Sequence, residues 1–193
     1  MRVILASASP RRRELLRQVG VEFEVIPAVG EELGTATEPG ELVKELAACK
    51  AQEVFQRVKA SPETGNGDFA VLGADTVVAL DGKILGKPGD KREAFAMLSA
   101  LQGRRHQVYS GVAICFMREG RQDRKCFHVM TEVGVFPMTE AQITAYIATG
   151  EPMDKAGAYG IQGRFARYIE GITGDYYNVV GLPVSRVVQA LFS

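Results

Sequence analysis

Basic residues gather at the start of an expected helix near the N-terminus. Arg11, Arg12 and Arg13 directly follow Ser9-Pro10, a pair typical of an N-cap and a first helical position. A helix N-terminus carries partial positive charge and unpaired N–H groups, so adjacent cations are unfavourable there unless an anion is bound. Ser7 adds a hydroxyl in the preceding turn. The pattern indicates a phosphate site, with a solvated basic face as the alternative.

A carboxylate interrupts an apolar, strand-like segment. Asp75 and Thr76 follow Gly73-Ala74 within residues 69–80, with valine or leucine on both sides. A charge among apolar neighbours costs free energy unless it is paired or bound to a cation, and the glycine lets a ligand or another backbone approach. Asp75 is therefore a candidate general base or metal ligand, and a structural aspartate bonded to a turn is the alternative.

Four further charged residues have both a functional and an ordinary interpretation. Lys87 lies between glycine and proline, as a positioned cation or a plain loop lysine. Lys50 stands among small apolar residues of an expected helix, where it contacts phosphate or extends to solvent. Glu31 and Asp175 lie in glycine-flanked segments, from which either could reach a metal. The alternatives are a solvated loop acid for Glu31 and a turn residue for Asp175.

The elements that must position these residues alternate between strands and helices. Residues 150–163 contain too many glycines for a packed element and fit a loop that embraces a substrate better than a plain linker. An Asp81-Gly82 pair predicts a two-residue hairpin. We expect one domain over residues 1–193, with a mixed sheet in an α/β (mixed α+β) fold. The expected strands are 3–6, 21–26, 69–80, 83–85, 107–116, 126–136 and 167–169, and the expected helices 10–19, 39–59, 91–101, 140–148 and 183–192.

Composition excludes several classes of protein. Lys+Arg and Asp+Glu both number 23, so no net field attracts nucleic acid or an anionic membrane. Three cysteines and two histidines argue against a disulfide framework and a zinc site. No secretion signal or membrane-length apolar run is present, which predicts a soluble, cytoplasmic protein. The phosphate-binding loop of P-loop NTPases and the dinucleotide fingerprint are also missing.

Seven segments in order resemble the Maf family of nucleotide pyrophosphatases and span nearly the whole chain. Two departures stand out: Ser110 where the family usually has threonine, and Gly30 where an acid is frequent before Glu31. The matching segments are residues 7–12, 50–51, 73–76, 86–88, 106–112, 154–163 and 174–183.

The resemblance implies a fold, a reaction and a set of roles. It implies an elongated mixed sheet with helices on both sides, two lobes with a central cleft, a divalent metal (magnesium or manganese) and, in many members, a homodimer. The activity would convert a nucleoside triphosphate to the monophosphate and pyrophosphate. By position, Asp75 matches the proton acceptor. Arg11, Thr76 and Gln162 match specificity positions. Arg12, Glu31, Lys50, Lys87 and Asp175 match cleft residues that hold phosphate or metal, beside the Ser7 hydroxyl already assigned to the phosphate site.

The segment 154–163 resembles the subgroup that acts on dTTP and UTP. Gln162 offers one acceptor and two donors, so its carboxamide can meet N3–H and a carbonyl of uracil or thymine, unless it bonds only to backbone. Two alternatives stay open: a pyrophosphatase for modified nucleotides such as 7-methyl-GTP, and a non-catalytic nucleotide- or nucleic-acid-binding regulator of septum formation. Zero net charge disfavours nucleic acid, and Asp75 has no task in a pure anion binder.

Overall fold

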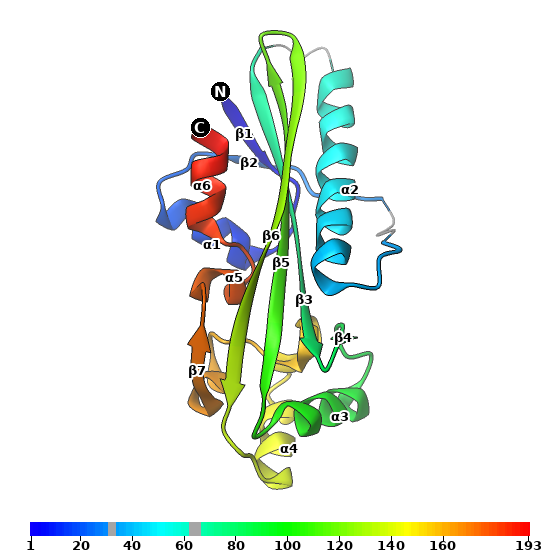
Figure 1. Cartoon of the computed structure of the whole chain (residues 1–193), viewed down its shortest axis with the longest axis vertical. Coiled ribbons are helices and arrows are strands. Elements are labelled where there is room, and N and C mark those ends of the chain that lie inside the picture. The colour runs from blue at the N-terminus through cyan, green and yellow to red at the C-terminus, as the bar shows by residue number, and fades with distance from the viewer. Residues whose placement is uncertain (31–33, 62–66) are drawn as a thin grey trace.

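The computed structural model describes residues 1–30, 34–61 and 67–193, which form an elongated molecule (Figure 1). A long hairpin of β5 and β6 runs along most of its length. The elements are β1 (Arg2–Leu5), α1 (Pro10–Gln18), β2 (Glu24–Val25), α2 (Pro39–Ala60), β3 (Phe69–Leu80), β4 (Lys83–Leu85), α3 (Lys91–Leu101), β5 (Arg105–Arg118), β6 (Arg121–Val135), α4 (Glu140–Ala148), the 3₁₀ helices η1 (Glu151–Asp154), η2 (Ala156–Ala158) and η3 (Arg164–Tyr168), β7 (Ile169–Thr173), α5 (Tyr176–Val180) and α6 (Val184–Phe192).

The strands form one mixed sheet of seven, which confirms the expected fold class. The order is β2-β1-β3-β5-β6-β7, and β4 pairs with β3 off this path. β1 runs parallel to both β2 and β3, whereas the remaining pairs are antiparallel. Short β1 therefore borders only the first part of the much longer β3.

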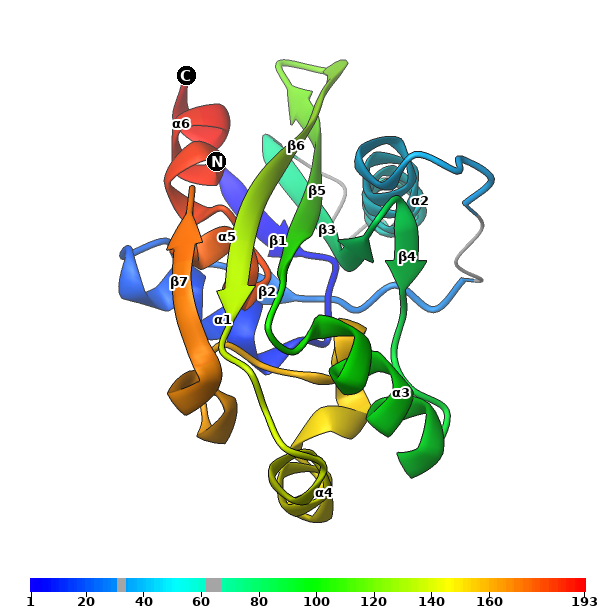
Figure 2. The ribbon, with the colours of Figure 1, turned by 60° about the horizontal axis from the view of Figure 1, so that its bottom comes forward.

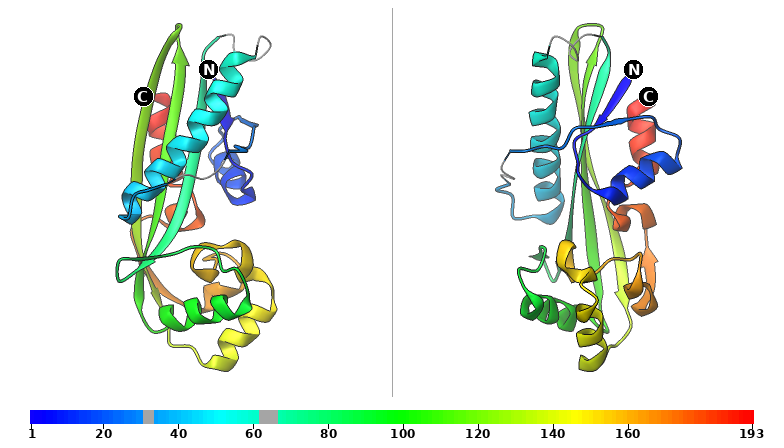
Figure 3. Two further views of the ribbon diagram at one scale, coloured as in Figure 1. Left: turned by 90° about the vertical axis from the view of Figure 1, so that its right-hand side faces the viewer. Right: turned by 180° about the vertical axis from the view of Figure 1, so that it is seen from behind.

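Helices cover both faces of this sheet, as Figure 3 shows for α2 on one side and α1 and α6 on the other. Alternate residues of β3 supply the two cores, because successive side chains of a strand point to opposite faces. Phe69 and Val71 pack with α2, whereas Ala70 and Leu72 belong to the larger core that includes α1, α3, α4 and α6.

Along the long axis the elements form two groups, which agree with the two expected lobes. α1, α2 and α6 lie toward one end, and α3, α4 and the 3₁₀ helices toward the other (Figures 1 and 2). The cleft between them stays a prediction. In the described ranges, no helix combines the length and apolarity needed to cross a bilayer.

Glycine lets α2 lie directly on the sheet. A Cβ on Gly73 of β3 would overlap the backbone of Ala47, and one on Gly111 of β5 would overlap that of Val43. Gly73 was singled out from sequence as a point of close approach, and the structure shows that the approaching backbone is α2. This contact fixes the height of α2 over β3 and so places Lys50 above Asp75.

Substituting Gly73→Ala should therefore destabilise the fold. The added methyl must push α2 from the sheet, an overpacking effect of about 1–3 kcal/mol in the free energy of unfolding. Urea denaturation measures it. Gly171→Ala is the matched control, because a Cβ at Gly171 in β7 meets nothing within 4 Å. Equal stability of the two variants would contradict the close packing of α2 on Gly73.

Some boundaries differ from those expected. β5 and β6 are longer than the strands expected over 107–116 and 126–136. They join through a two-residue turn, with Glu119 and Gly120 at φ 49° and 75°. The strand expected over residues 21–26 is only Glu24–Val25, and α5 was not predicted. The Asp81-Gly82 hairpin and the helix expected over residues 140–148 are confirmed, and the structure shows that Thr139 caps this helix.

Candidate active site

The site lies at a gap along one edge of β3. On that edge β1 pairs with residues 69–72 of β3, and β4 pairs with residues 78–80. On this edge, no strand of the described chain pairs with residues 73–77, which lie between the two pairings. On the opposite edge, β5 pairs with all five of these residues. The turn that follows β1 leads into α1 at this gap.

Asp75 and Thr76 flank the gap from opposite faces of the sheet. Asp75 shares the face of Gly73, under α2, and Thr76 shares the face of Ala74, toward α1. The carbonyl of Leu72 accepts from Ala6 N at 2.8 Å, so the backbone groups of alternate residues, including Thr76, face this same edge. A ligand lying in the gap can thus meet backbone donors and acceptors together with side chains from both faces.

On the α2 face, Lys50 and Asp75 form a close ion pair. Lys50 Nζ donates to Asp75 Oδ1 at 2.5 Å, and each side chain is only 14% exposed. The sequence required a partner for this carboxylate, and the structure identifies it as the lysine 25 residues earlier. The ammonium thus supplies the counter-charge that a carboxylate among apolar neighbours requires.

On the opposite face, Arg12 joins three parts of the chain. Its guanidinium donates to Gly181 O at 2.9 Å, to Ser7 Oγ at 3.1 Å and to Thr76 Oγ1 at 3.3 Å. Thr76 Oγ1 lies 2.8 Å from Ser110 Oγ, which itself donates to a backbone carbonyl of α5. Because Ser110 donates onward, Thr76 donates to Ser110 and accepts from Arg12. Sequence reasoning noted Ser110 only as a departure from the family and did not predict this network.

Arg11 extends toward the segment that follows α4. Its Nη1 lies 3.5 Å from Asp154 Oδ2, and Lys155 Nζ donates to Asp154 Oδ1 at 2.6 Å. Burial works to raise the pKa of Asp154, but the hydrogen bond from Lys155 and the charges of Lys155 and Arg11 outweigh it, so this pKa lies below its usual range. Asp154 was not among the predicted site residues, since only the fold brings it to α1.

The start of α1 retains the features of an anion site. Ser9 makes no side-chain capping bond, and the first turn holds no acidic residue. A helix start without a side-chain cap or an acidic neighbour is in keeping with a bound phosphate.

The glycine-rich segment after α4 packs beside the gap. Gly157 N donates to Gly86 O at 3.0 Å, and a Cβ on Gly157 would come within 3.0 Å of Val78 in β3. Lys87 follows Gly86 and is exposed. Gln162 is also exposed, in a bend between η2 and η3. The roles of Lys87 and Gln162 stay predictions.

The predicted metal ligands are not brought together within the described chain. Glu31 lies outside the described residues. Asp175 caps α5, accepting from Tyr177 N at 2.8 Å, and its role as a metal ligand stays a prediction. No group of three or more His, Cys, Asp or Glu that could hold a metal occurs in residues 1–30, 34–61 and 67–193. Among the described residues, Asp75 is a predicted ligand that the structure places beside the gap.

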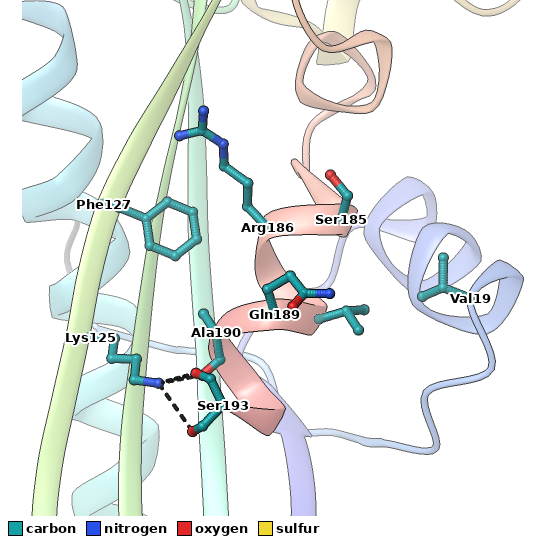
Figure 4. Close-up of a pocket in the computed structure, with 9 residues that line it drawn as sticks. Val19, Lys125, Phe127, Ser185, Arg186, Gln189, Ala190 and Ser193 are labelled. Carbon is teal, nitrogen blue, oxygen red and sulfur yellow. Dashed lines mark hydrogen bonds between the residues drawn. The ribbon is translucent and has the colours of Figure 1, made fainter.

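A hollow lies away from these residues. A cavity of about 650 Å³ opens between α6, β6 and the end of α1, lined by Phe127, Val188 and Val19 with Lys125 and Arg186 at its border (Figure 4). None of the predicted site residues lines it.

The chain is similar to known proteins over nearly its whole length. The family described as "Maf-like protein" matches residues 2–193. A relative from Agathobacter rectalis named dTTP/UTP pyrophosphatase is 53% identical, with 98% of this chain and 95% of the relative covered. Relatives of the same name from Symbiobacterium thermophilum and Bacillus anthracis are 52% and 47% identical, covering 98% of this chain and 92% and 94% of their own.

Among solved structures, the Staphylococcus aureus Ham1 protein is similar with a TM-score of 0.45 and 15% identity, over 88% of this chain and 80% of that one. The family match covers nearly every residue, and the segments that form the gap are those that carry the resemblance. The chain belongs to the Maf family.

Proposed function

We propose that this chain hydrolyses nucleoside triphosphates, dTTP and UTP above others, to the monophosphate and pyrophosphate. The observation that carries the proposal is the Lys50–Asp75 pair at the open edge of β3, next to an uncapped helix start bearing Arg11 and Arg12. A candidate general base and a candidate phosphate site therefore border the same gap. The relatives named dTTP/UTP pyrophosphatase favour an enzyme over a non-catalytic regulator.

The triphosphate binds through the cations around the gap. The N–H groups at the start of α1 meet phosphate oxygens, and Ser7 and Arg12 lie directly beside them. Lys87 reaches in from the loop after β4, and Lys50 adds charge from α2. Fixed cations in a partly dry site stabilise the charge that develops on the leaving pyrophosphate more than water does.

Asp75 accepts the proton of the attacking water. The water oxygen forms a bond to the α-phosphorus as the bond from that phosphorus to the bridging oxygen breaks, and pyrophosphate leaves with the electron pair. The water proton passes to Asp75, whose side chain Lys50 holds in place by its hydrogen bond. A positioned base of this kind contributes about 10²–10⁴-fold to rate.

The residues at the gap fit a divalent metal such as magnesium or manganese. Magnesium is commonly held by one or two carboxylates together with substrate phosphates and water, so Asp75 beside the gap can supply the protein ligand. Asp75 would hold it, with Glu31 and Asp175 as the further predicted ligands. When bound, the metal supplies positive charge to the phosphates and lowers the pKa of coordinated water.

Base recognition rests on Gln162, with Arg11 and Thr76 as the other predicted specificity positions. A site built to hydrogen-bond a base edge rejects the wrong edge strongly, because its own polar groups would be left unpaired. Gln162→Glu removes the carboxamide donor. We expect kcat/KM for dTTP and UTP to fall about tenfold or more, the effect of a lost hydrogen bond in a specific site, while other triphosphates change little.

The assay compares all common triphosphates and 7-methyl-GTP. Gln189→Glu is the matched control, an exposed glutamine on α6 beside the remote cavity. A wild-type preference for purine or 7-methylated substrates, or an unselective loss in Gln162→Glu, would defeat the base assignment and leave pyrophosphate release untouched. The homodimer and the cytoplasmic location also stay predictions, the first open to light scattering.

A further inference from the structure

The turn that presents Gln162 is tied at both ends to one tyrosine–glutamate pair. Tyr146 of α4 accepts from Gly160 N at 3.4 Å and donates to Glu151 Oε1 at 2.9 Å. The other oxygen of Glu151 accepts from Arg164 N at 3.1 Å. The backbone before and after Gln162 is therefore held by a single connected pair of side chains.

The carboxylate of Glu151 sits inside the curve of this turn. Gly163 has φ 89°, and a Cβ there would come within 2.8 Å of Glu151 Oε1. Glu151 is itself held at its backbone, where its N–H donates to Thr149 Oγ1 at 3.2 Å and its carbonyl accepts from Lys155 Nζ at 2.6 Å. The turn is thus shaped around an anchored carboxylate.

Tyr146 is fixed in place by the core. It is 3% exposed, and its ring centroid lies 5.0 Å from that of Phe165, which also contacts Tyr159. Burial, together with the bond to Glu151, raises the pKa of Tyr146, so its hydroxyl stays protonated and can donate. Tyr159 in turn bonds to His106 of β5 at 2.7 Å, which links the aromatic cluster to the sheet.

We propose that Tyr146 and Glu151 are positioning residues for base specificity. They hold residues 160–164 in the shape that directs Gln162 toward a uracil or thymine edge, without touching the nucleotide themselves. The inference rests on the proposed function, in which Gln162 reads the base. Recognition by hydrogen bonds requires geometry held to about 0.5 Å, which an exposed glycine-rich turn does not maintain alone.

Tyr146→Phe tests the pair with little change in packing. The ring still stacks on Phe165, but the link to Glu151 and Gly160 is lost. We expect the ratio of kcat/KM for dTTP over dCTP to fall about tenfold, as for one lost hydrogen bond, because cytosine differs at N3 and C4, where the carboxamide acts. Tyr168→Phe is the control: its ring also packs on Phe165, at 5.5 Å, and no hydrogen bond of its hydroxyl to a described residue is seen.

A double-mutant cycle separates positioning from a general structural role. If Tyr146 acts through Gln162, its substitution should leave selectivity unchanged in a Gln162→Ala background. An equal further loss in that background, or unchanged selectivity in the single variant, would overturn the inference.

Hydrogen exchange supplies a readout that does not depend on activity. The amides of Gly160 and Arg164 should exchange faster in Tyr146→Phe and remain as in wild type in Tyr168→Phe, and unchanged exchange in the first would overturn the inference. If the wild type fails to hydrolyse dTTP, the proposed function fails instead, and exchange alone then decides whether the pair holds the turn.

Discussion

Replacing Asp75 by asparagine is expected to lower kcat for dTTP by about a thousandfold, within the range for loss of a positioned general base. The amide keeps the shape of the side chain but cannot accept the water proton and holds a cation poorly. Binding of a non-hydrolysable α,β-imido-dUTP should persist, because the cations around the gap are unchanged. Steady-state kinetics and calorimetric titration measure the two effects separately.

Asp81→Asn is the matched control for this variant. Asp81 lies in the hairpin after β3, exposed and paired with Arg104 at 2.8 Å, so the same chemical change there removes a surface ion pair only. Its turnover should equal that of the wild type. Turnover near wild type in Asp75→Asn would remove Asp75 from the mechanism, whatever the control shows.

Arg12→Ala is expected to act on both binding and stability. Loss of a charge-assisted contact to phosphate should weaken triphosphate binding about 10–100-fold, and binding of the nucleoside much less. The same guanidinium donates to Ser7, Thr76 and Gly181, so the free energy of unfolding should fall by about 2 kcal/mol as well. Titration with dTMP, imido-dUTP and thymidine gives the first effect, and urea denaturation the second.

Arg13→Ala tests whether position on the helix matters. The Arg13 guanidinium donates to Ala8 O at 2.7 Å in an exposed bond, so its removal lowers the net charge equally while leaving the gap intact. We expect small changes in affinity and stability. Equal weakening of nucleoside and triphosphate binding in Arg12→Ala would show that Arg12 serves the fold and does not bind phosphate.

Local patterns predicted the elements well because their signals are local. Asp81-Gly82 sets a hairpin by backbone conformation alone, and Thr139 caps α4 through a reciprocal bond with Gln142. The length of the β5–β6 hairpin was underestimated from the sequence, because charged residues like those at its tip are typical of a loop. There the strands pair through their backbones and leave those side chains exposed.

The sequence alone could not identify which residues contact the site residues. Asp75 needed a counter-charge, yet only the packing of α2 on Gly73 selects Lys50. Strand alternation could have shown that Asp75 and Thr76 point to opposite faces, but not that the sheet opens beside them.

Some residues whose partners lie on separate elements were not singled out from the sequence. Asp154, beside Arg11, and the Tyr146–Glu151 pair look ordinary in sequence, because their partners lie on separate elements. A glycine-rich run indicated that the segment was special, and only its fold shows which side chains shape it.

The central claim is tested most directly by identifying the products of dTTP hydrolysis by the wild-type chain with magnesium or manganese present. The account predicts dTMP and pyrophosphate in equal amounts, with turnover lost in Asp75→Asn and retained in Asp81→Asn. Formation of dTDP and inorganic phosphate, or no turnover of any nucleoside triphosphate with either metal, would contradict it.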